Sequence, residues 1–190
     1  MNIVIAGVTC SGKTTLAKKI QNTYRDVSIM PQDSYFKDLQ EIPKHKGRYL
    51  MDSINAFEYG EYQQDSVTLL DQGQVHIPRY DISMNRRFAK DLLLLKKELI
   101  IFEGLHAIKL LPDVDALKIF LMTSLSECLK RRIARDSKQY GVEPSVIEEY
   151  FKEVVEPMYK EYILPQSALA DVVIREGDDM EWVLKKYIRS

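Results

Sequence analysis

The chain of 190 residues is poor in the features that mark special classes of protein. It has two cysteines, Cys10 and Cys128, which provide neither a disulfide framework nor a metal-ligand spacing. No apolar run approaches the ~20 residues needed to cross a bilayer, and the N-terminus lacks the basic start of a signal peptide. We therefore expect reduced thiols, no membrane partner and a cytoplasmic protein.

An excess of charge is also absent, with 27 basic and 28 acidic residues and a formal net charge of -1. Because a nucleic-acid-binding domain usually carries a basic face, no nucleic-acid partner is expected. Hydrophobic residues make up 45% of the chain, which is enough for a substantial core. The length predicts a single domain over residues 1–190.

Short apolar runs alternate with helical patterns along the chain. The apolar runs predict five buried strands, at 2–6, 27–30, 99–102, 117–122 and 171–174. Helices are expected over 13–24, 54–70, 125–138, 145–155 and 180–188. Pro157 should kink or end the fourth of these helices, and a β-hairpin is expected at about 75–89. This alternation predicts an α/β fold, a three-layer α/β/α domain with a five-stranded parallel sheet.

The strongest local signal is a complete G-x-x-x-x-G-K-[ST] match directly after the first predicted strand. Its two glycines let the backbone turn tightly, so that successive N–H groups and a helix N-terminus surround an anion. The lysine would contact the β- and γ-phosphates, and the following threonine would ligate magnesium. We expect ATP, with Mg²⁺, to bind at Gly7, Val8, Thr9, Cys10, Ser11, Gly12, Lys13, Thr14 and Thr15.

This loop alone does not separate kinases from GTPases or ATPases. The chain lacks the Asn-Lys-x-Asp string of guanine recognition and is too short for helicase or transporter ATPases. Asp33 follows the second predicted strand, where parallel sheets bind ligands, and could accept the proton of an attacking hydroxyl. Glu103 follows the third strand and could hold magnesium together with Thr14. A turn or helix cap is the alternative for Asp33, and a helix cap is the alternative for Glu103.

Arginines gather on the predicted helix 125–138, at Arg131, Arg132 and Arg135. Arg131 and Arg135 are four residues apart and therefore share a face of that helix. They favour a lid over about 128–146 that closes on ATP and stabilises charge on the transferred phosphoryl group. A solvated basic face is the alternative. These features together predict a P-loop kinase fold with a small β-hairpin insert and a helical lid.

Several strings resemble the uridine kinases of the phosphoribulokinase and uridine kinase family, in the family's order and over Asn2 to about Gly177. They are GVTCSGKT, QDSYF, MDSINAFE, PRYDISMNRR, FEGLHAI, RRIARD and LPQSALADVVI. The resemblance implies that Asp33 is the base for a 5'-hydroxyl and that Asp52 binds ribose hydroxyls. It also implies that Tyr80 and Arg87 belong to the hairpin that binds the nucleoside, and that Arg131 and Arg135 are the lid pair.

Two positions depart from the family pattern. Asn85 stands where uridine kinases usually have a histidine that reads the pyrimidine, and it can donate and accept hydrogen bonds but cannot titrate. Cys128 stands where an arginine is frequent. The strings GVTCSGKTTLAKKIQ, SECLKRR and EPMYKEY are similar to nicotinamide riboside kinases, which phosphorylate the same ribose hydroxyl beside a cationic pyridine.

The sequence thus predicts ATP-dependent phosphorylation of a nucleoside 5'-hydroxyl, with Asp52, Tyr80, Asn85 and Arg87 binding the nucleoside. Uridine or cytidine is the first choice of acceptor, and nicotinamide riboside or another small alcohol is the alternative. A non-catalytic nucleotide sensor is the alternative outside the enzymes, although it would have no use for both Asp33 and Asp52. Uridine kinases are often homo-oligomers, but no interface is visible in this sequence.

Overall fold

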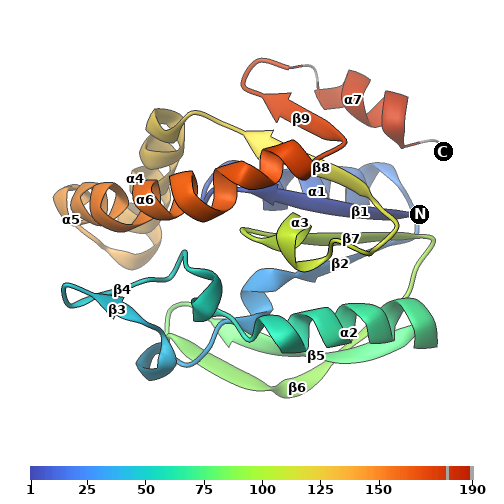
Figure 1. Cartoon of the computed structure of the whole chain (residues 1–190), viewed down its shortest axis with the longest axis horizontal. Helices are drawn as coiled ribbons and strands as arrows, with labels where there is room; N and C mark the ends of the chain where they lie inside the picture. Colours follow the sequence, from blue (N-terminus) through green and yellow to red (C-terminus); the bar gives the residue numbers. More distant parts are fainter. Residues whose placement is uncertain (179, 189–190) are drawn as a thin grey trace.

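The computed structural model describes residues 1–178 and 180–188. Its centre is a parallel sheet of five strands in the order β2-β7-β1-β8-β9 (Figure 1). The strands are β1 (Asn2–Gly7), β2 (Val27–Pro31), β7 (Leu99–Gly104), β8 (Leu117–Met122) and β9 (Val172–Arg175). The predicted five-stranded parallel sheet is confirmed, because each apolar run forms a strand of it.

Helices cover both faces of this sheet. They are α1 (Lys13–Thr23), α2 (Tyr59–Gln72), α3 (Ala107–Leu110), α4 (Leu125–Tyr140), α5 (Pro144–Tyr150), α6 (Glu156–Met158) and α7 (Met180–Tyr187). Side chains alternate along each strand, so Ile3 and Ile5 pack with α1 and α7. Val4 and Ala6 point to the opposite core, which contains α3 and the segment around α6. The α/β prediction of three layers is therefore confirmed.

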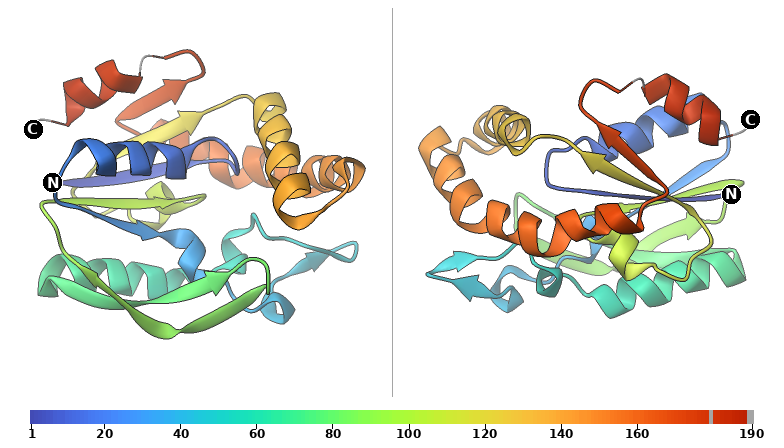
Figure 2. Two further views of the ribbon diagram at one scale, coloured as in Figure 1. Left: turned by 180° about the vertical axis from the view of Figure 1, so that it is seen from behind. Right: turned by 45° about the horizontal axis from the view of Figure 1, so that its top comes forward.

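A β-hairpin lies beside α2 at the edge of the sheet near β2, as Figures 1 and 2 show together. It consists of β5 (Gln74–Asp81) and β6 (Arg86–Leu95), with a register shift between Ile77 and Arg79. The hairpin is longer than the predicted 75–89. Residues 92–95 also pair with β5, although this run of leucines lacks the alternation of polar and apolar residues that marks an exposed strand. A second small ribbon, β3 (Lys44–His45) with β4 (Arg48–Tyr49), was not predicted from the sequence.

The predicted helix 54–70 is divided in the structure. Ile54–Ala56 forms a separate 3-10 turn capped by the Ser53 hydroxyl, and α2 begins only at Tyr59. Phe57 is extended instead and forms an isolated antiparallel bridge with Phe36, with the two rings stacked 4.1 Å apart. A tertiary contact thus overrides the helical pattern at this point.

Pro157 was predicted to kink or end its helix, and the structure shows that the helix does not end there. The chain stays helical from Pro144 to Leu169, through a π-helical segment at Phe151–Val155 and another at Tyr159–Ile163. Proline has no N–H and its ring crowds the carbonyl four residues earlier. The wider π turns on either side take up this disturbance, so α6 continues through the proline. Nowhere in the described ranges is a helix both long and apolar enough to cross a bilayer.

Candidate active site

The loop between β1 and α1 turns at two glycines. A Cβ on Gly7 would lie 2.8 Å from the Leu121 carbonyl oxygen and 2.8 Å from the Ser11 hydroxyl, closer than atoms normally approach. Gly12 has φ 105° and caps the start of α1. Both positions therefore require glycine, and they wrap the loop's backbone around the N-terminus of α1.

Lys13 is the charged group at the bottom of this loop. Its side chain is buried, and its ammonium donates a hydrogen bond of 3.0 Å to the Val8 carbonyl oxygen. The Ser11 hydroxyl is buried in the same loop without a hydrogen-bond partner among the described residues. A positive charge that donates to a neutral carbonyl, next to a hydroxyl without a partner in the described part of the chain, fits the phosphate groups of a nucleotide.

Thr14 and Glu103 meet at the mouth of the loop. The Thr14 hydroxyl donates a hydrogen bond of 3.0 Å to Oε1 of Glu103, whose strand β7 pairs directly with β1. Burial raises the pKa of Glu103, and the Asp33 carboxylate raises it further, while Lys13 and the Thr14 hydrogen bond oppose the shift. These hard oxygen atoms fit Mg²⁺, which proteins usually hold through one or two side chains together with phosphate oxygens.

Asp33 lies in a 3-10 turn, Gln32–Tyr35, that directly follows β2. Pro31 at the end of β2 pairs with Glu103, so the turn emerges beside the loop. Solvent reaches the Asp33 carboxyl, but protein surrounds it closely, and this partial desolvation raises its pKa. Lys13 and Arg135 oppose that rise through their positive charges, so both cations lie within electrostatic reach of Asp33.

Asp52 joins the same group of charges from the loop after β4. It is buried, and its Oδ2 lies 3.8 Å from a guanidinium nitrogen of Arg132. Burial raises the pKa of Asp52, while Arg132 and Lys13 lower it and Asp33 raises it. The His106 ring holds this segment, because its Nε2 lies 2.9 Å from the Asp52 carbonyl oxygen. The structure thus brings Asp33, Asp52 and Lys13 together at the carboxyl ends of the strands.

The arginines of α4 approach this group in different ways. Arg131 reaches the loop, with Nη1 3.5 Å from the Cys10 carbonyl oxygen. Arg135 donates to Asp136 at 2.6 Å and acts on Asp33 through its charge. The sequence did not single out Arg132, which lies 5.0 Å above the Tyr150 ring and pairs with Asp52. Its place in a row of arginines was the only signal, and that signal cannot tell which guanidinium turns inward.

The hairpin residues make mainly structural contacts. The Tyr80 ring lies 5.1 Å from the Phe36 ring, and its hydroxyl has no hydrogen-bond partner among the described residues. Asn85 has φ 48° and turns the chain at the hairpin tip, a conformation that Asn tolerates. Arg87 forms an ion pair with Glu61 of α2. Nucleoside contacts by Asn85 and Arg87 therefore stay predictions, as does an ATP contact by Thr15, which is exposed on α1.

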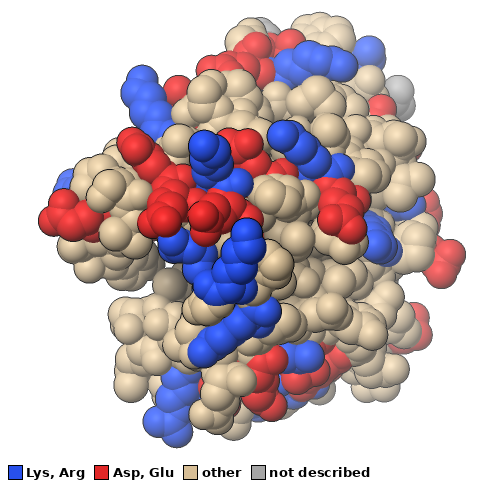
Figure 3. All heavy atoms as spheres, turned by 60° about the vertical axis from the view of Figure 1, so that its left-hand side comes forward, with Lys and Arg blue, Asp and Glu red and all other residues tan. Residues whose placement is uncertain are grey.

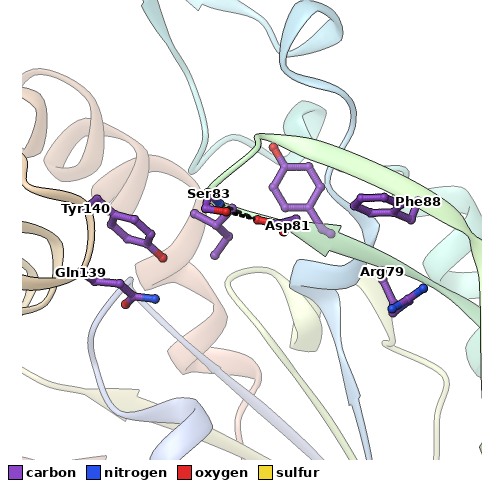
Figure 4. Close-up of a pocket in the computed structure, with 8 residues that line it drawn as sticks. Arg79, Asp81, Ser83, Phe88, Gln139 and Tyr140 are labelled. Carbon is purple, nitrogen blue, oxygen red and sulfur yellow. Dashed lines mark hydrogen bonds between the residues drawn. The ribbon is translucent and has the colours of Figure 1, made fainter.

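A cavity of about 480 Å³ separates the hairpin tip from the end of α4 (Figure 4). Tyr140 and Gln139 line it from α4 and face the hairpin residues Asp81, Ser83 and Phe88. On the face where the carboxyl ends of the strands emerge, Figure 3 shows a band of Lys and Arg side chains beside a group of acidic ones. Positive charge is thus concentrated locally although the chain is nearly neutral.

A lysine-bearing glycine loop, a threonine–carboxylate pair at its mouth and a five-stranded parallel sheet define a nucleotide-binding protein of the P-loop class. It belongs to the phosphoribulokinase / uridine kinase family, whose model matches residues 2–182. The protein is accordingly a kinase, a phosphotransferase.

Relatives with assigned names share most of the chain. It is 34% identical to a uridine kinase of Halalkalibacterium halodurans over 181 residues, 92% of this chain and 85% of the relative. It is 33% identical to a uridine kinase of Staphylococcus carnosus, again over 92% of this chain and 86% of the relative. Its fold matches the structure of a possible uridine kinase from Bacillus stearothermophilus with a TM-score of 0.61 at 18% identity, covering 92% and 88% of the two chains. The resemblance noted in the sequence is thus confirmed at the level of the family.

Proposed function

We propose that the protein transfers the γ-phosphoryl group of ATP to the 5'-hydroxyl of a nucleoside, with uridine or cytidine as the acceptor. One observation carries the proposal: Asp33 lies within electrostatic reach of Lys13 and Glu103 at the mouth of the phosphate loop. The relatives named uridine kinase support the choice of acceptor. A cytoplasmic location and a homo-oligomer stay predictions.

The donor half of the site is the loop of residues 7–14. Its amides and Lys13 would hold the phosphates, and Thr14 with Glu103 would hold Mg²⁺, which neutralises charge on the phosphate oxygens when bound. The Lys13 ammonium donates a hydrogen bond to the neutral Val8 carbonyl oxygen, and moving it onto a phosphate would exchange this bond for one to a charged acceptor.

Asp33 would orient the acceptor hydroxyl and accept its proton. Phosphoryl transfer has a loose transition state and depends mainly on positioning, so an ordinary carboxylate is sufficient as the base. Partial desolvation raises the pKa of Asp33, which makes its ionised form a better proton acceptor than a fully hydrated aspartate.

Asp52 and the arginines of α4 would fix the acceptor and cover the reaction. Asp52 is buried beside Arg132 and could accept hydrogen bonds from two ribose hydroxyls, while the Arg132 charge opposes the rise in the pKa of Asp52 that burial causes. Arg131 and Arg135 stand over the loop and near Asp33, where a closing α4 would bring positive charge to the transferred group.

A cationic pyridine nucleoside is the second candidate acceptor. The cavity beside the hairpin tip is lined by the rings of Tyr80, Phe88 and Tyr140 and by the Asp81 carboxyl. Aromatic faces and a carboxylate both attract a cation, and nicotinamide riboside carries its positive charge on the ring. The aromatic lining also suits a neutral pyrimidine, so uridine and cytidine remain first.

A coupled assay of ADP release tests both candidates. Uridine, cytidine and nicotinamide riboside are added singly to the protein with ATP and Mg²⁺. We expect uridine or cytidine to stimulate ADP release strongly over the rate with ATP alone. Stimulation by nicotinamide riboside only would favour the second candidate. If none of the three stimulated ADP release although ATP bound, the proposal would be wrong, and another small alcohol as acceptor or a nucleotide sensor would be the remaining alternatives.

A further inference from the structure

We propose that Lys90, Asp65 and Tyr35 form a positioning relay, which ties the acceptor hairpin to the turn that carries Asp33. The inference rests on the proposed function, because it assigns these residues to the alignment of the proposed base. Lys90 comes from β6, Asp65 from α2 and Tyr35 from the 3-10 turn after β2. Three separate segments thus meet through hydrogen bonds to one buried carboxylate.

The turn is held from the side of α2. Tyr35 is fully buried, two residues after Asp33, and its hydroxyl donates a hydrogen bond of 2.8 Å to Oδ2 of Asp65. Its carbonyl oxygen accepts a hydrogen bond of 2.8 Å from the Glu58 amide at the start of α2. A 3-10 turn of four residues has little stability of its own, so these two bonds, together with the packing of the Tyr35 ring against Tyr62, hold Asp33 in place.

The hairpin is held by the other oxygen of the same carboxylate. The Lys90 ammonium lies 2.7 Å from Oδ1 of Asp65 and 3.0 Å from Oε1 of Glu61. Glu61 also pairs with Arg87, whose amide donates a hydrogen bond of 2.9 Å to Asp38. Arg87 is therefore an anchor of the hairpin in this arrangement, next to the relay.

Asp65 is the centre of the relay because it is almost completely buried. Burying a carboxylate is costly unless it is paired with a cation and hydrogen-bonded, and here Lys90 supplies the cation and Tyr35 a donor. Removing the Lys90 charge leaves the buried Asp65 carboxylate without this cation, so we expect the carboxylate to shift and its bond to Tyr35 to change. Displacing reacting groups by 1 Å can lower a rate about a hundredfold.

Replacing Lys90 and Tyr35 separately and together tests the relay. In Lys90→Met we expect kcat to fall about tenfold or more, with an unchanged KM for ATP, and Lys90→Arg should restore most of it. Tyr35→Phe should lower kcat to a similar extent. The kcat of the double variant should be little lower than that of either single variant, because both changes break the same connection through Asp65. Lys97→Met is the matched control, since Lys97 pairs with Asp26 away from the relay, and it should keep the wild-type kcat.

Amide hydrogen exchange over residues 32–38 supplies a readout that needs no turnover. Lys90→Met should exchange faster in this segment than wild type, while Lys97→Met should not. An unchanged kcat in Lys90→Met, or a fall in its melting temperature with no faster exchange at 32–38, would overturn the relay. A wild type that no nucleoside stimulates would overturn the proposed function instead, and the exchange experiment would still decide whether the turn is tied to the hairpin.

Discussion

Adding one methyl group at residue 7 should weaken nucleotide binding strongly while the fold survives. In Gly7→Ala the new Cβ would lie 2.8 Å from the backbone oxygen of Leu121 and 2.8 Å from the Ser11 hydroxyl. Carbon and oxygen atoms normally stay beyond about 3.2 Å, so the loop must move by roughly half an ångström, and the backbone oxygen in β8 cannot yield easily. A strained loop no longer directs its amides at one point, so we expect ATP affinity to fall by about two orders of magnitude.

Gly60→Ala is the matched control, because a Cβ at Gly60 meets nothing within 4 Å. This glycine lies in α2, where alanine should stabilise the protein by about 0.5 kcal/mol and leave ATP binding unchanged. Isothermal titration with a non-hydrolysable ATP analogue measures both variants, and circular dichroism checks their folding. A folded Gly7→Ala protein that binds the analogue as tightly as Gly60→Ala would refute the proposed role of the loop.

Two further predictions concern pH. Asp33 must be ionised to accept a proton, so kcat should fall as the pH drops through the raised pKa of Asp33. Because the Arg135 charge lowers that pKa, the acid limb of the pH–kcat profile should move to higher pH in Arg135→Met. An acid limb at the wild-type pH in this variant would contradict the prediction. Burial lowers the pKa of His106 to about 4 from an ordinary value near 6.5. His106 therefore binds a proton at a higher pH in the unfolded chain than in the folded protein. The folded protein should lose about 3 kcal/mol of stability as the pH falls from 6.5 to 4. Urea unfolding of His106→Gln, compared with wild type, should lack this part of the loss.

The phosphate loop and the sheet could be predicted because their signals are local. The run Asn2–Ala6 is a buried strand by composition alone, and the loop's two glycines and lysine follow it without a gap. The carboxyl ends of parallel strands meet at one edge, so Asp33 and Glu103 could be placed near the loop from the sequence. These inferences needed no knowledge of how distant segments pack.

The remaining features depend on contacts between distant segments. The stacking of Phe57 on Phe36 delays the start of α2, and the partner of Arg87 is Glu61 on another element. The inward turn of Arg132 depends on the Tyr150 ring, which belongs to α5. A helical pattern or a row of arginines is compatible with several such packings, so the sequence alone could not select among them.

The most direct test of the central claim is the effect of Asp33→Asn on turnover and on ATP binding, measured side by side. The substitution keeps the size of the side chain and removes its ability to take a proton. We predict a loss in kcat of about 10² to 10⁴ with nearly unchanged ATP affinity, in line with the usual contribution of a general base. Wild-type turnover in Asp33→Asn, or an equal loss of turnover and ATP binding, would contradict the assignment of Asp33 as the base.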